Sequence, residues 1–206
     1  MKRIHTKNTQ NIYQEHKNMS QAKTLTPAEY ERLFAYVAER KYALRNKLIL
    51  LTGFKTGMRV GEIAQLTLGM ILDAEGKVKS EFVLTANMTK GGFARTVYIP
   101  SSLRTQLQEY VDLRGDTHPT HPLFVSAGGR AFSPNMLTQN LFWLFRKAGI
   151  TNASSHTMRR QYITGLATKG TSIKVLSTLA GHRSIQVTAK YIDTNPDLLR
   201  NAAELA

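Results

Sequence analysis

The segment GHRSIQVTAKYI, residues 181 to 192, places His182 and Tyr191 nine positions apart among basic and hydroxyl side chains. A tyrosine in such a segment either packs one ring face and leaves its hydroxyl in water, or acts as a nucleophile. Because the pKa of a phenol is about 10, attack near neutral pH requires a positive potential at the hydroxyl. The choice between the two interpretations therefore depends on cationic side chains elsewhere in the chain.

Two candidate cations lie where the chain is expected to turn. Arg59, in TGMRVGEI, follows a glycine that ends a helix, and Glu62 lies three residues later on the same helical face. This pair can aim a guanidinium at an anion, although for such a fragment alone a surface ion pair is the more common case. Lys90 lies on the turn TKGG. A lysine there is usually solvated, but it could also reach a phosphate or a leaving oxygen.

The segment SHTMRRQYIT contains two further candidates. His156 and Arg159 are three residues apart, so in a helix they share a face and could both donate hydrogen bonds to one phosphate. The histidine could also take a proton near neutral pH, because its reference pKa is about 6.5. On this fragment alone, a solvated cationic turn is an equally good interpretation.

Together these side chains could cleave a phosphodiester. Attack on phosphorus builds negative charge on the non-bridging oxygens, which two arginines can bind. A histidine can accept the nucleophile's proton, and a lysine can protonate the departing 5′ oxygen. Covalent capture by tyrosine would keep the bond energy for rejoining. This set requires no metal, and the acidic residues are scattered without a D-x-D or paired-glutamate motif.

Helices are expected to position most of these candidates. Thr26 suits an N-cap, Pro27 the first helical position, and Glu29 completes a capping box. An apolar helix is expected to end near Gly57, and the next to begin near Val60. Further helices are predicted over 101–114, 133–149, 156–168, 172–180, 184–192 and 196–205.

A small sheet is predicted in the middle of the chain. Residues alternate in two runs, 77–85 and 93–99, which predict antiparallel strands. The turn between them contains Gly91-Gly92, which permits positive φ. The fold class predicted is therefore mainly α with a small antiparallel β-sheet (α+β), in one compact domain. Residues 118–126 are expected to be a short extended piece.

Two further groups of residues, one aromatic and one of histidines, are expected to have ordinary structural roles rather than chemical ones. Phe142, Trp143 and Phe145 belong to the predicted helix 133–149 and are expected in the core rather than stacked on bases. His118 and His121 flank prolines in HPTHP, but a metal site is not expected there in a chain without cysteine.

Composition restricts the class of protein. The 206 residues are 42% hydrophobic, enough for one well-buried core. A net charge of +14 favours a polyanionic partner, most often nucleic acid, and leaves ribosomal proteins, repressors and nucleic-acid enzymes open. The sequence has no long apolar run, no signal-peptide core and no cysteine. We therefore expect a cytoplasmic, nucleic-acid-associated protein with a flexible basic arm over residues 1–22.

The order and spacing of these segments resemble the tyrosine recombinase, or phage-integrase, family. TGMRVGEIAQL resembles that family's first-arginine box, TKGGFARTVYIP its lysine hairpin, HTMRRQYITGLATKG its His-x-x-Arg helix, and LAGHRSIQVTAKYI its final His-to-Tyr box. The resemblance implies a tyrosine recombinase catalytic domain over 23–206. It also implies a site-specific DNA recombinase, of the integration, excision or inversion type, that works without a metal or other cofactor.

The resemblance further implies that seven side chains act at the scissile phosphate of DNA. Arg59 and Arg159 would bind the phosphate from two sides, and Glu62 would support Arg59. Lys90 would be the general acid, and His156 would assist proton transfer. His182 would hydrogen-bond a non-bridging oxygen, and Tyr191 would form a 3′-phosphotyrosyl link.

Two features depart from the family pattern. Arg160 stands where many members have a histidine, at a position more structural than chemical. Larger members also carry an N-terminal helical domain, whereas this sequence has only the basic arm. We therefore expect either a short recombinase or a catalytic fragment.

The implied partners are double-stranded DNA with specific inverted-repeat sites, a homo-oligomer that is tetrameric on DNA, and accessory DNA-bending proteins. The tail 196–206 would pack on its own core or on a neighbouring subunit. A type IB topoisomerase and a catalytically silent DNA-binding regulator remain as alternatives.

Overall fold

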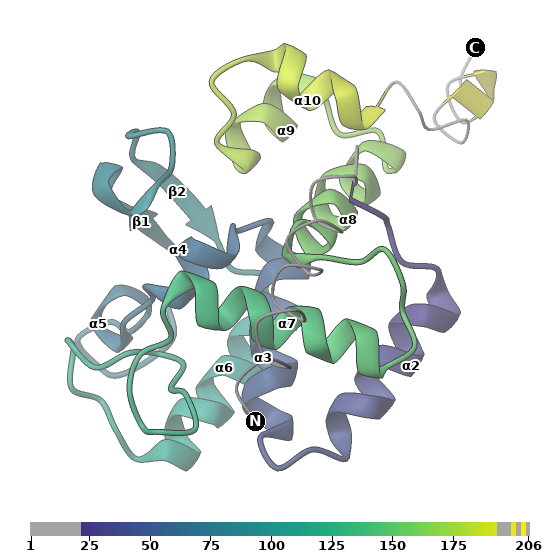
Figure 1. Cartoon of the computed structure of the whole chain (residues 1–206). Helices are drawn as coiled ribbons and strands as arrows, with labels where there is room; N and C mark the ends of the chain where they lie inside the picture. Colours follow the sequence, from purple (N-terminus) through teal and green to yellow (C-terminus); the bar gives the residue numbers. More distant parts are fainter. Residues whose placement is uncertain (1–21, 193–198, 201–202, 205–206) are drawn as a thin grey trace, which may run out of the picture.

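The computed structural model describes residues 22–192, 199–200 and 203–204, and these confirm a mainly helical fold with one small antiparallel sheet (Figure 1). In chain order the elements are α2 (Pro27–Ala38), α3 (Ala43–Thr56), α4 (Val60–Ala64), α5 (Leu68–Ile71), β1 (Glu81–Leu84), the 3-10 helix η1 (Ala86–Met88), β2 (Arg95–Tyr98), α6 (Ser101–Arg114), α7 (Pro134–Lys147), α8 (Ser155–Thr168), α9 (Ile173–Ala180) and α10 (Ile185–Ile192).

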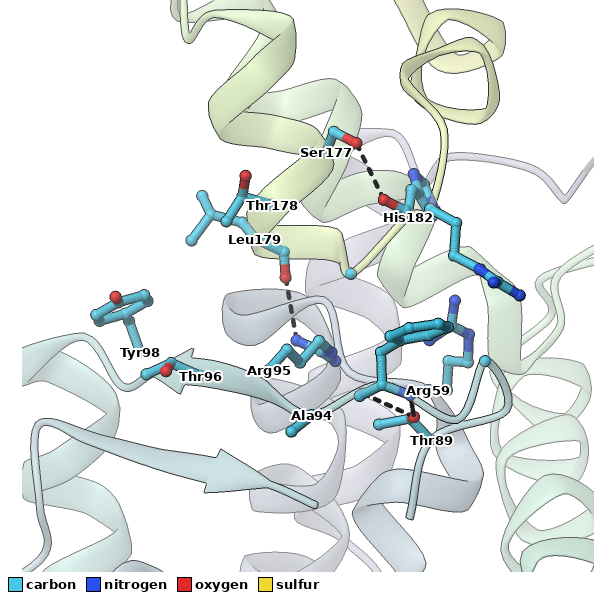
Figure 2. A pocket seen from close by; sticks show the side chains of 14 residues that line it. Arg59, Thr89, Ala94, Arg95, Thr96, Tyr98, Ser177, Thr178, Leu179 and His182 are labelled. Carbon is cyan, nitrogen blue, oxygen red and sulfur yellow. Dashed lines mark hydrogen bonds between the residues drawn. The ribbon is translucent and has the colours of Figure 1, made fainter. Parts of the chain in front are cut away.

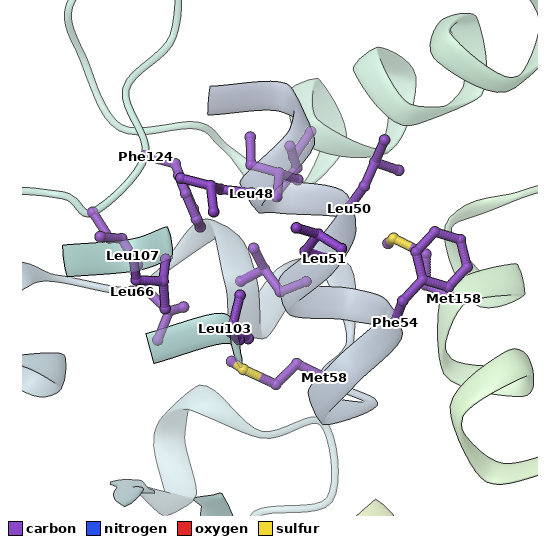
Figure 3. Packing of buried hydrophobic residues seen from close by; sticks show 14 of the residues in the cluster. Leu48, Leu50, Leu51, Phe54, Met58, Leu66, Leu103, Leu107, Phe124 and Met158 are labelled. Carbon is purple, nitrogen blue, oxygen red and sulfur yellow. The ribbon is translucent and has the colours of Figure 1, made fainter. Parts of the chain in front are cut away.

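Helix α3 forms the centre of the core. The consecutive residues 48–51 are all buried, and α2, α6 and α8 pack against this helix. Figure 3 shows Leu48, Leu50 and Leu51 among buried side chains from other elements. A helix that is apolar on every side is stable only when it is covered on every side. Each fully buried leucine or isoleucine contributes about 1.5–3 kcal/mol. The end of α3 is therefore a rigid base for the segment that follows it.

The predicted helix boundaries around this core are confirmed. The Glu29 amide donates to Thr26 Oγ1 at 3.2 Å, and the Thr26 amide donates back to Glu29 Oε2 at 3.1 Å, which completes the capping box. Helix α3 ends at Gly57, whose φ of 65° is left-handed, and α4 begins at Val60. The break between these two helices thus leads directly to Arg59.

The two strands are shorter than the alternation predicted. They pair in the register Glu81↔Tyr98 to Leu84↔Arg95, so four residues pair on each side. The connection contains η1 and a turn closed by Thr89, whose hydroxyl accepts from the Phe93 amide at 3.1 Å. Of the two turn glycines, only Gly92 has a positive φ. The predicted turn TKGG is thus confirmed as a loop, which Thr89 closes, while residues 77–80, 85, 93–94 and 99 of the predicted runs lie outside the two strands.

The core prediction is wrong for one aromatic residue of α7. Phe145 is completely buried, whereas Trp143 is 42% exposed and Phe142 is intermediate. The buried stripe of α7 consists of Leu137, Leu141, Leu144 and Phe145. Trp143 lies about 100° around the helix from Leu144 and about 200° from Leu141, so it is outside this stripe. Its ring meets that of Phe142 edge-on at 5.4 Å.

Other predictions fall on irregular or undescribed parts of the chain. The piece 118–126 contains two isolated bridges, Thr67↔Pro122 and Val125↔Ala131, rather than a strand. Residues 1–21 of the predicted arm, and most of the predicted helix 196–205, lie outside the described residues. No helix among the described residues is both long and apolar enough to cross a membrane.

Candidate active site

Arg59 is the N-cap of α4, the position that its sequence context predicted. Its amide donates to Glu62 Oε2 at 2.8 Å, and its guanidinium Nη1 lies 3.0 Å from Glu62 Oε1. Glu62 is buried, whereas the Arg59 side chain is 26% exposed. The carboxylate therefore holds the backbone and the side chain of Arg59 together, and the guanidinium still reaches the surface.

Arg95 also binds Glu62, and the sequence prediction did not include it. It opens strand β2, and its Nη2 donates to Glu62 Oε2 at 2.7 Å while its Nη1 donates to the Leu179 carbonyl at 3.0 Å. The alternation of inward- and outward-facing side chains along β2 indicates that Arg95 is engaged inside the fold. Val97 and Ile99 face the core, so Arg95 must face inward too. A charged residue on the inward face of a strand needs a partner from elsewhere in the fold.

Arg159 lies in α8, deeper than the other two arginines. Its Nη1 donates to the Gly57 carbonyl at 2.8 Å, and its Nη2 donates to the Ala180 carbonyl. Gly57 ends α3 and Ala180 ends α9, so this guanidinium joins the ends of two helices. Carbonyls at helix C-termini lack intrahelical partners and carry partial negative charge, which suits a cation.

The three arginines carry more charge than the chain around them balances. Glu62 is the only acid among the described residues that pairs with Arg59 or Arg95, and Arg159 pairs with none. A surplus of two positive charges remains. Burial and the charges of Arg59 and Arg95 lower the pKa of Arg159 to about 10, so the guanidinium is still ionised at neutral pH. An anion bound here would relieve this repulsion.

His182 faces the same charges from the turn after α9. Gly181 ends that helix with a φ of 63°, and the imidazole Nδ1 lies 2.8 Å from the hydroxyl of the buried Thr188. Burial, together with Arg159, Arg59 and Arg95, lowers the pKa of His182 to about 4. The ring is therefore neutral near pH 7, and with Nδ1 engaged by Thr188 its Nε2 is the nitrogen left to meet a ligand.

Tyr191 lies beside this histidine on α10. The two rings stack with centroids 5.9 Å apart and planes inclined by 18°, and the Arg160 guanidinium lies 5.7 Å from the tyrosine ring centroid. Tyr191 is only partly buried. The phenol is therefore not sealed in the core, and it lies next to a cation and to the histidine of the arginine site.

A cavity of about 690 Å³ opens onto this site between the hairpin and α9. Figure 2 shows Arg95 beneath the end of α9, with Arg59 and His182 to its right in this view; all three line the cavity. The Arg183 guanidinium stacks over the Phe93 ring at 4.4 Å, which links the α9–α10 turn to the hairpin loop. The cavity brings residues from α4, β2 and the end of α9 to one place.

Lys90 and His156 are both exposed at the surface. Lys90 is exposed on the hairpin turn between Thr89 and Gly91, which both line the cavity, and it has no hydrogen-bond or ion-pair partner among the described residues. His156 is exposed in the first turn of α8, one turn before Arg159. Arg59, Glu62, Arg159, His182 and Tyr191 are thus brought together, whereas the two proton-transfer candidates lie at the surface nearby.

The described residues contain no cluster of three or more histidine, cysteine, aspartate or glutamate side chains that could hold a metal ion. His121 Nδ1 pairs with Asp116 Oδ1 at 3.0 Å, and its ring lies 4.5 Å from that of His118. These contacts occupy the HPTHP segment without forming such a cluster.

Comparison with known proteins places the chain in a family. The model of the phage integrase family matches residues 23–197. The chain belongs to the phage integrase family. This confirms the resemblance found in the sequence, and the arginine site lies entirely within the matched residues.

Relatives and solved structures agree with this assignment. Tyrosine recombinase XerA of Pyrococcus furiosus is 32% identical over 187 residues, which cover 89% of this chain and 62% of XerA. A crystal structure of XerA recombinase superposes with a TM-score of 0.72 at 26% identity, over 89% of this chain and 64% of that one. The Tn1549 transposon integrase, in complex with transposon right end DNA, shares the fold at 20% identity and a TM-score of 0.69, over 91% of this chain and 67% of that one.

Proposed function

We propose that the chain is the catalytic part, over residues 23–206, of a site-specific DNA recombinase that cleaves and rejoins double-stranded DNA through Tyr191. The observation that carries this proposal is the arginine site: Arg59 and Arg95 share the carboxylate of Glu62, and the buried Arg159 lies among them without an acidic partner of its own, beside a stacked histidine and tyrosine. A phosphodiester is an anion that guanidiniums bind through its oxygens, and its charge would offset part of the positive surplus. Solved structures of similar proteins bound to DNA add support: the Tn1549 transposon integrase with transposon right end DNA, and the XerH site-specific recombinase with a palindromic difH substrate.

The proposed cleavage step assigns a balanced role to each group. The Tyr191 oxygen attacks phosphorus, the bond to the 5′ oxygen breaks, and the DNA strand is left on the enzyme as a 3′-phosphotyrosine. Arg59 and Arg159 bind the non-bridging oxygens as negative charge develops, and the neutral His182 donates one hydrogen bond to them. Rejoining reverses these steps, because the phosphotyrosine retains the energy of the broken bond.

Proton transfer is assigned to the two surface residues. His156 would accept the proton from Tyr191, directly or through water, and Lys90 would protonate the departing 5′ oxygen. Lys90 has the freedom for this role because its turn is exposed and the side chain has no partner among the residues that the structure describes. DNA bound over the cavity would bring the leaving oxygen toward the hairpin.

A nicked suicide substrate tests the proposal. It carries a recognition site from the DNA that flanks the coding region, with a nick near the cleavage position, so that the short fragment diffuses away and traps the covalent intermediate. Wild type should form a protein–DNA adduct that survives denaturation, and Tyr191→Phe should bind the same DNA without forming one. Absence of the adduct from wild type on every inverted repeat of that region would contradict the proposal.

A matched control excludes a nearby competing nucleophile. Tyr98 lines the cavity and is 51% exposed. Tyr98→Phe should therefore leave adduct formation at the wild-type level. Loss of the adduct in Tyr98→Phe, with retention in Tyr191→Phe, would reassign the nucleophile.

Assays with two DNA duplexes distinguish a recombinase from the alternative functions and test for its partners. A recombinase should bring two sites together as a homo-oligomer, tetrameric in the full synapse, with DNA-bending proteins as accessory factors. A type IB topoisomerase would relax supercoiled plasmid without strand exchange, and a silent regulator would bind DNA without an adduct. Deleting residues 196–206 should weaken assembly on DNA more than folding if the tail contacts a neighbouring subunit.

A further inference from the structure

Arg95 is the point at which the hairpin, α4 and the end of α9 are joined. Its hydrogen bonds to Glu62 and to Leu179 connect residues 33 and 84 positions away in the sequence. The contact to Glu62, at 2.7 Å, is shorter than the 3.0 Å contact between Arg59 and the same carboxylate. Arg95 is also the more buried of the two arginines, at 8% exposed against 26%.

These contacts determine where the charge of Glu62 is balanced. A buried carboxylate with a single guanidinium partner forms a closed ion pair, and that pair would compete with any phosphate for the guanidinium. Here a second guanidinium occupies Oε2, so the carboxylate is balanced without Arg59. The partly exposed Arg59 then keeps a charge that it can offer to an incoming anion.

The aliphatic part of Arg95 supports a second element of the site. Gly181 packs directly on it, because a Cβ at this glycine would lie 2.4 Å from Arg95 Cδ. The same arginine holds the carbonyl of Leu179 two residues earlier. The turn that carries His182 is therefore seated on the stem and on the guanidinium of one side chain.

We propose that Arg95 is a positioning residue of the cleavage site. It balances Glu62, so that Arg59 can bind the phosphate, and it seats the turn that presents His182. This inference rests on the proposed function, since it assigns Arg95 a part in the same cleavage step. A substitution that removes the positive charge of Arg95 should slow cleavage more than one that keeps the charge but loses the bridging hydrogen bonds.

Two substitutions separate charge from shape. Both Arg95→Lys and Arg95→Gln break the bridge between Glu62 and Leu179, but only lysine keeps the positive charge. In single-turnover cleavage of the nicked substrate at saturating protein, we expect Arg95→Gln to be slower than wild type by about 10- to 100-fold. Arg95→Lys should recover at least about tenfold of this loss. DNA affinity should change much less than the cleavage rate in both variants.

A neutral phosphate provides a readout that a purely structural role would not move. A methylphosphonate at the scissile position removes one negative charge, so the substrate depends less on the charge of Arg59. The Arg95→Gln defect should therefore be several-fold smaller on this substrate than on the ordinary phosphodiester. A buried arginine outside the site, Arg45, supplies the control. Arg45→Gln should lower stability but show the wild-type ratio between the two substrates.

The outcomes distinguish the inference from the function on which it rests. Equal cleavage by Arg95→Lys and Arg95→Gln, or equal defects of Arg95→Gln on both substrates, would overturn the positioning role while wild type still forms its adduct. A wild type that forms no adduct on Tyr191 would overturn the proposed function and this inference with it. Circular dichroism and thermal melts on every variant establish that folded proteins are being compared.

Discussion

Arg45 and Arg159 are buried to nearly the same extent, 7% and 4% exposed, but their surroundings differ. Arg45 donates to Asn46 Oδ1 and to the Val125 carbonyl, and its guanidinium lies over the Tyr42 ring at 4.2 Å. Burial lowers the pKa of Arg45, and two nearby tyrosines oppose that shift. Neutral acceptors and rings thus satisfy this cation without a ligand.

Arg159 is also hydrogen-bonded, but it lies among other cations. Arg59 and Arg95 both lower its pKa, and Glu62 opposes them only in part. Burial alone therefore does not mark a functional arginine, because Arg45 is as deeply buried. The distinguishing feature is a surplus of like charge around the buried group, which the chain leaves for an anion to balance.

Substitutions of Arg159 and Arg45 should differ most in their effect on the cleavage rate. Arg159→Met should reduce adduct formation by about 10²- to 10³-fold, because it removes a donor from the oxygens on which charge develops. Arg45→Met should leave the cleavage rate of the folded protein unchanged. Urea unfolding should show losses of about 1–3 kcal/mol for each variant, since both leave buried carbonyls unpaired. Similar cleavage by the two variants would remove the distinction between these regions.

A pair of glycines sharpens the comparison at the level of the backbone. Gly181 and Gly115 both end helices with nearly equal φ, 63° and 62°, but a Cβ meets Arg95 only at Gly181, and nothing lies within 4 Å at Gly115. Alanine at either position should cost about 1–2 kcal/mol of stability from the left-handed conformation. Only Gly181→Ala should also slow cleavage, by at least about tenfold, in the single-turnover assay.

If Gly115→Ala slowed cleavage as much as Gly181→Ala, the effect would come from general loss of stability. A wild-type rate for Gly181→Ala would show that the turn before His182 does not depend on its contact with Arg95.

Local sequence signals predicted the scaffold well. The capping box at Thr26, the end of α3 at Gly57 and the stripe of α7 follow from spacing within one element. Strand lengths were overestimated at both ends, because the alternation of residue types runs on past the four residues on each side that pair. Trp143 was misplaced because it was grouped with the apolar residues next to it in the sequence, although its helical phase puts it outside the buried stripe.

The site was predicted in part, and the missing part is tertiary. Arg59, Arg159, His182 and Tyr191 stand in recognisable segments, and the structure brings them together. Arg95 was missed because its importance depends on a carboxylate 33 residues away and on a helix end 84 residues away. No periodicity within its own strand identifies those partners, although its inward position shows that a partner must exist.

A smaller effect is expected from the pH dependence of stability. The pKa of His182 is about 4 in the folded protein, below the ordinary 6.5. Between these values the unfolded chain binds a proton that the folded protein does not, so stability rises with pH and is lost as pH falls from 6.5 toward 4. His182→Asn should show a weaker dependence than wild type in urea unfolding from pH 4.5 to 7. An unchanged dependence would contradict the lowered pKa.

The smallest effect concerns the contact that joins the hairpin to the α9–α10 turn. Phe93→Leu removes the ring over which Arg183 lies at 4.4 Å, a contact worth about 0.5–1 kcal/mol at an exposed position. Cleavage should slow by about two- to fivefold. Tyr36→Leu removes a ring at the same 4.4 Å distance from Arg40, away from the site, and should leave cleavage unchanged. Equal rates for both variants would show that this contact does not hold the hairpin.

The most direct test of the central claim is to locate the nucleotide on the protein. After trapping on the suicide substrate and digestion with nuclease and protease, mass spectrometry should find the nucleotide on the peptide that contains Tyr191, in wild type and in Tyr98→Phe. In Arg159→Met, little of this peptide should carry the nucleotide. Nucleotide attached to Tyr98 or another residue, or undiminished modification of Tyr191 in Arg159→Met, would contradict the claim that the buried arginines form the phosphate site for this tyrosine.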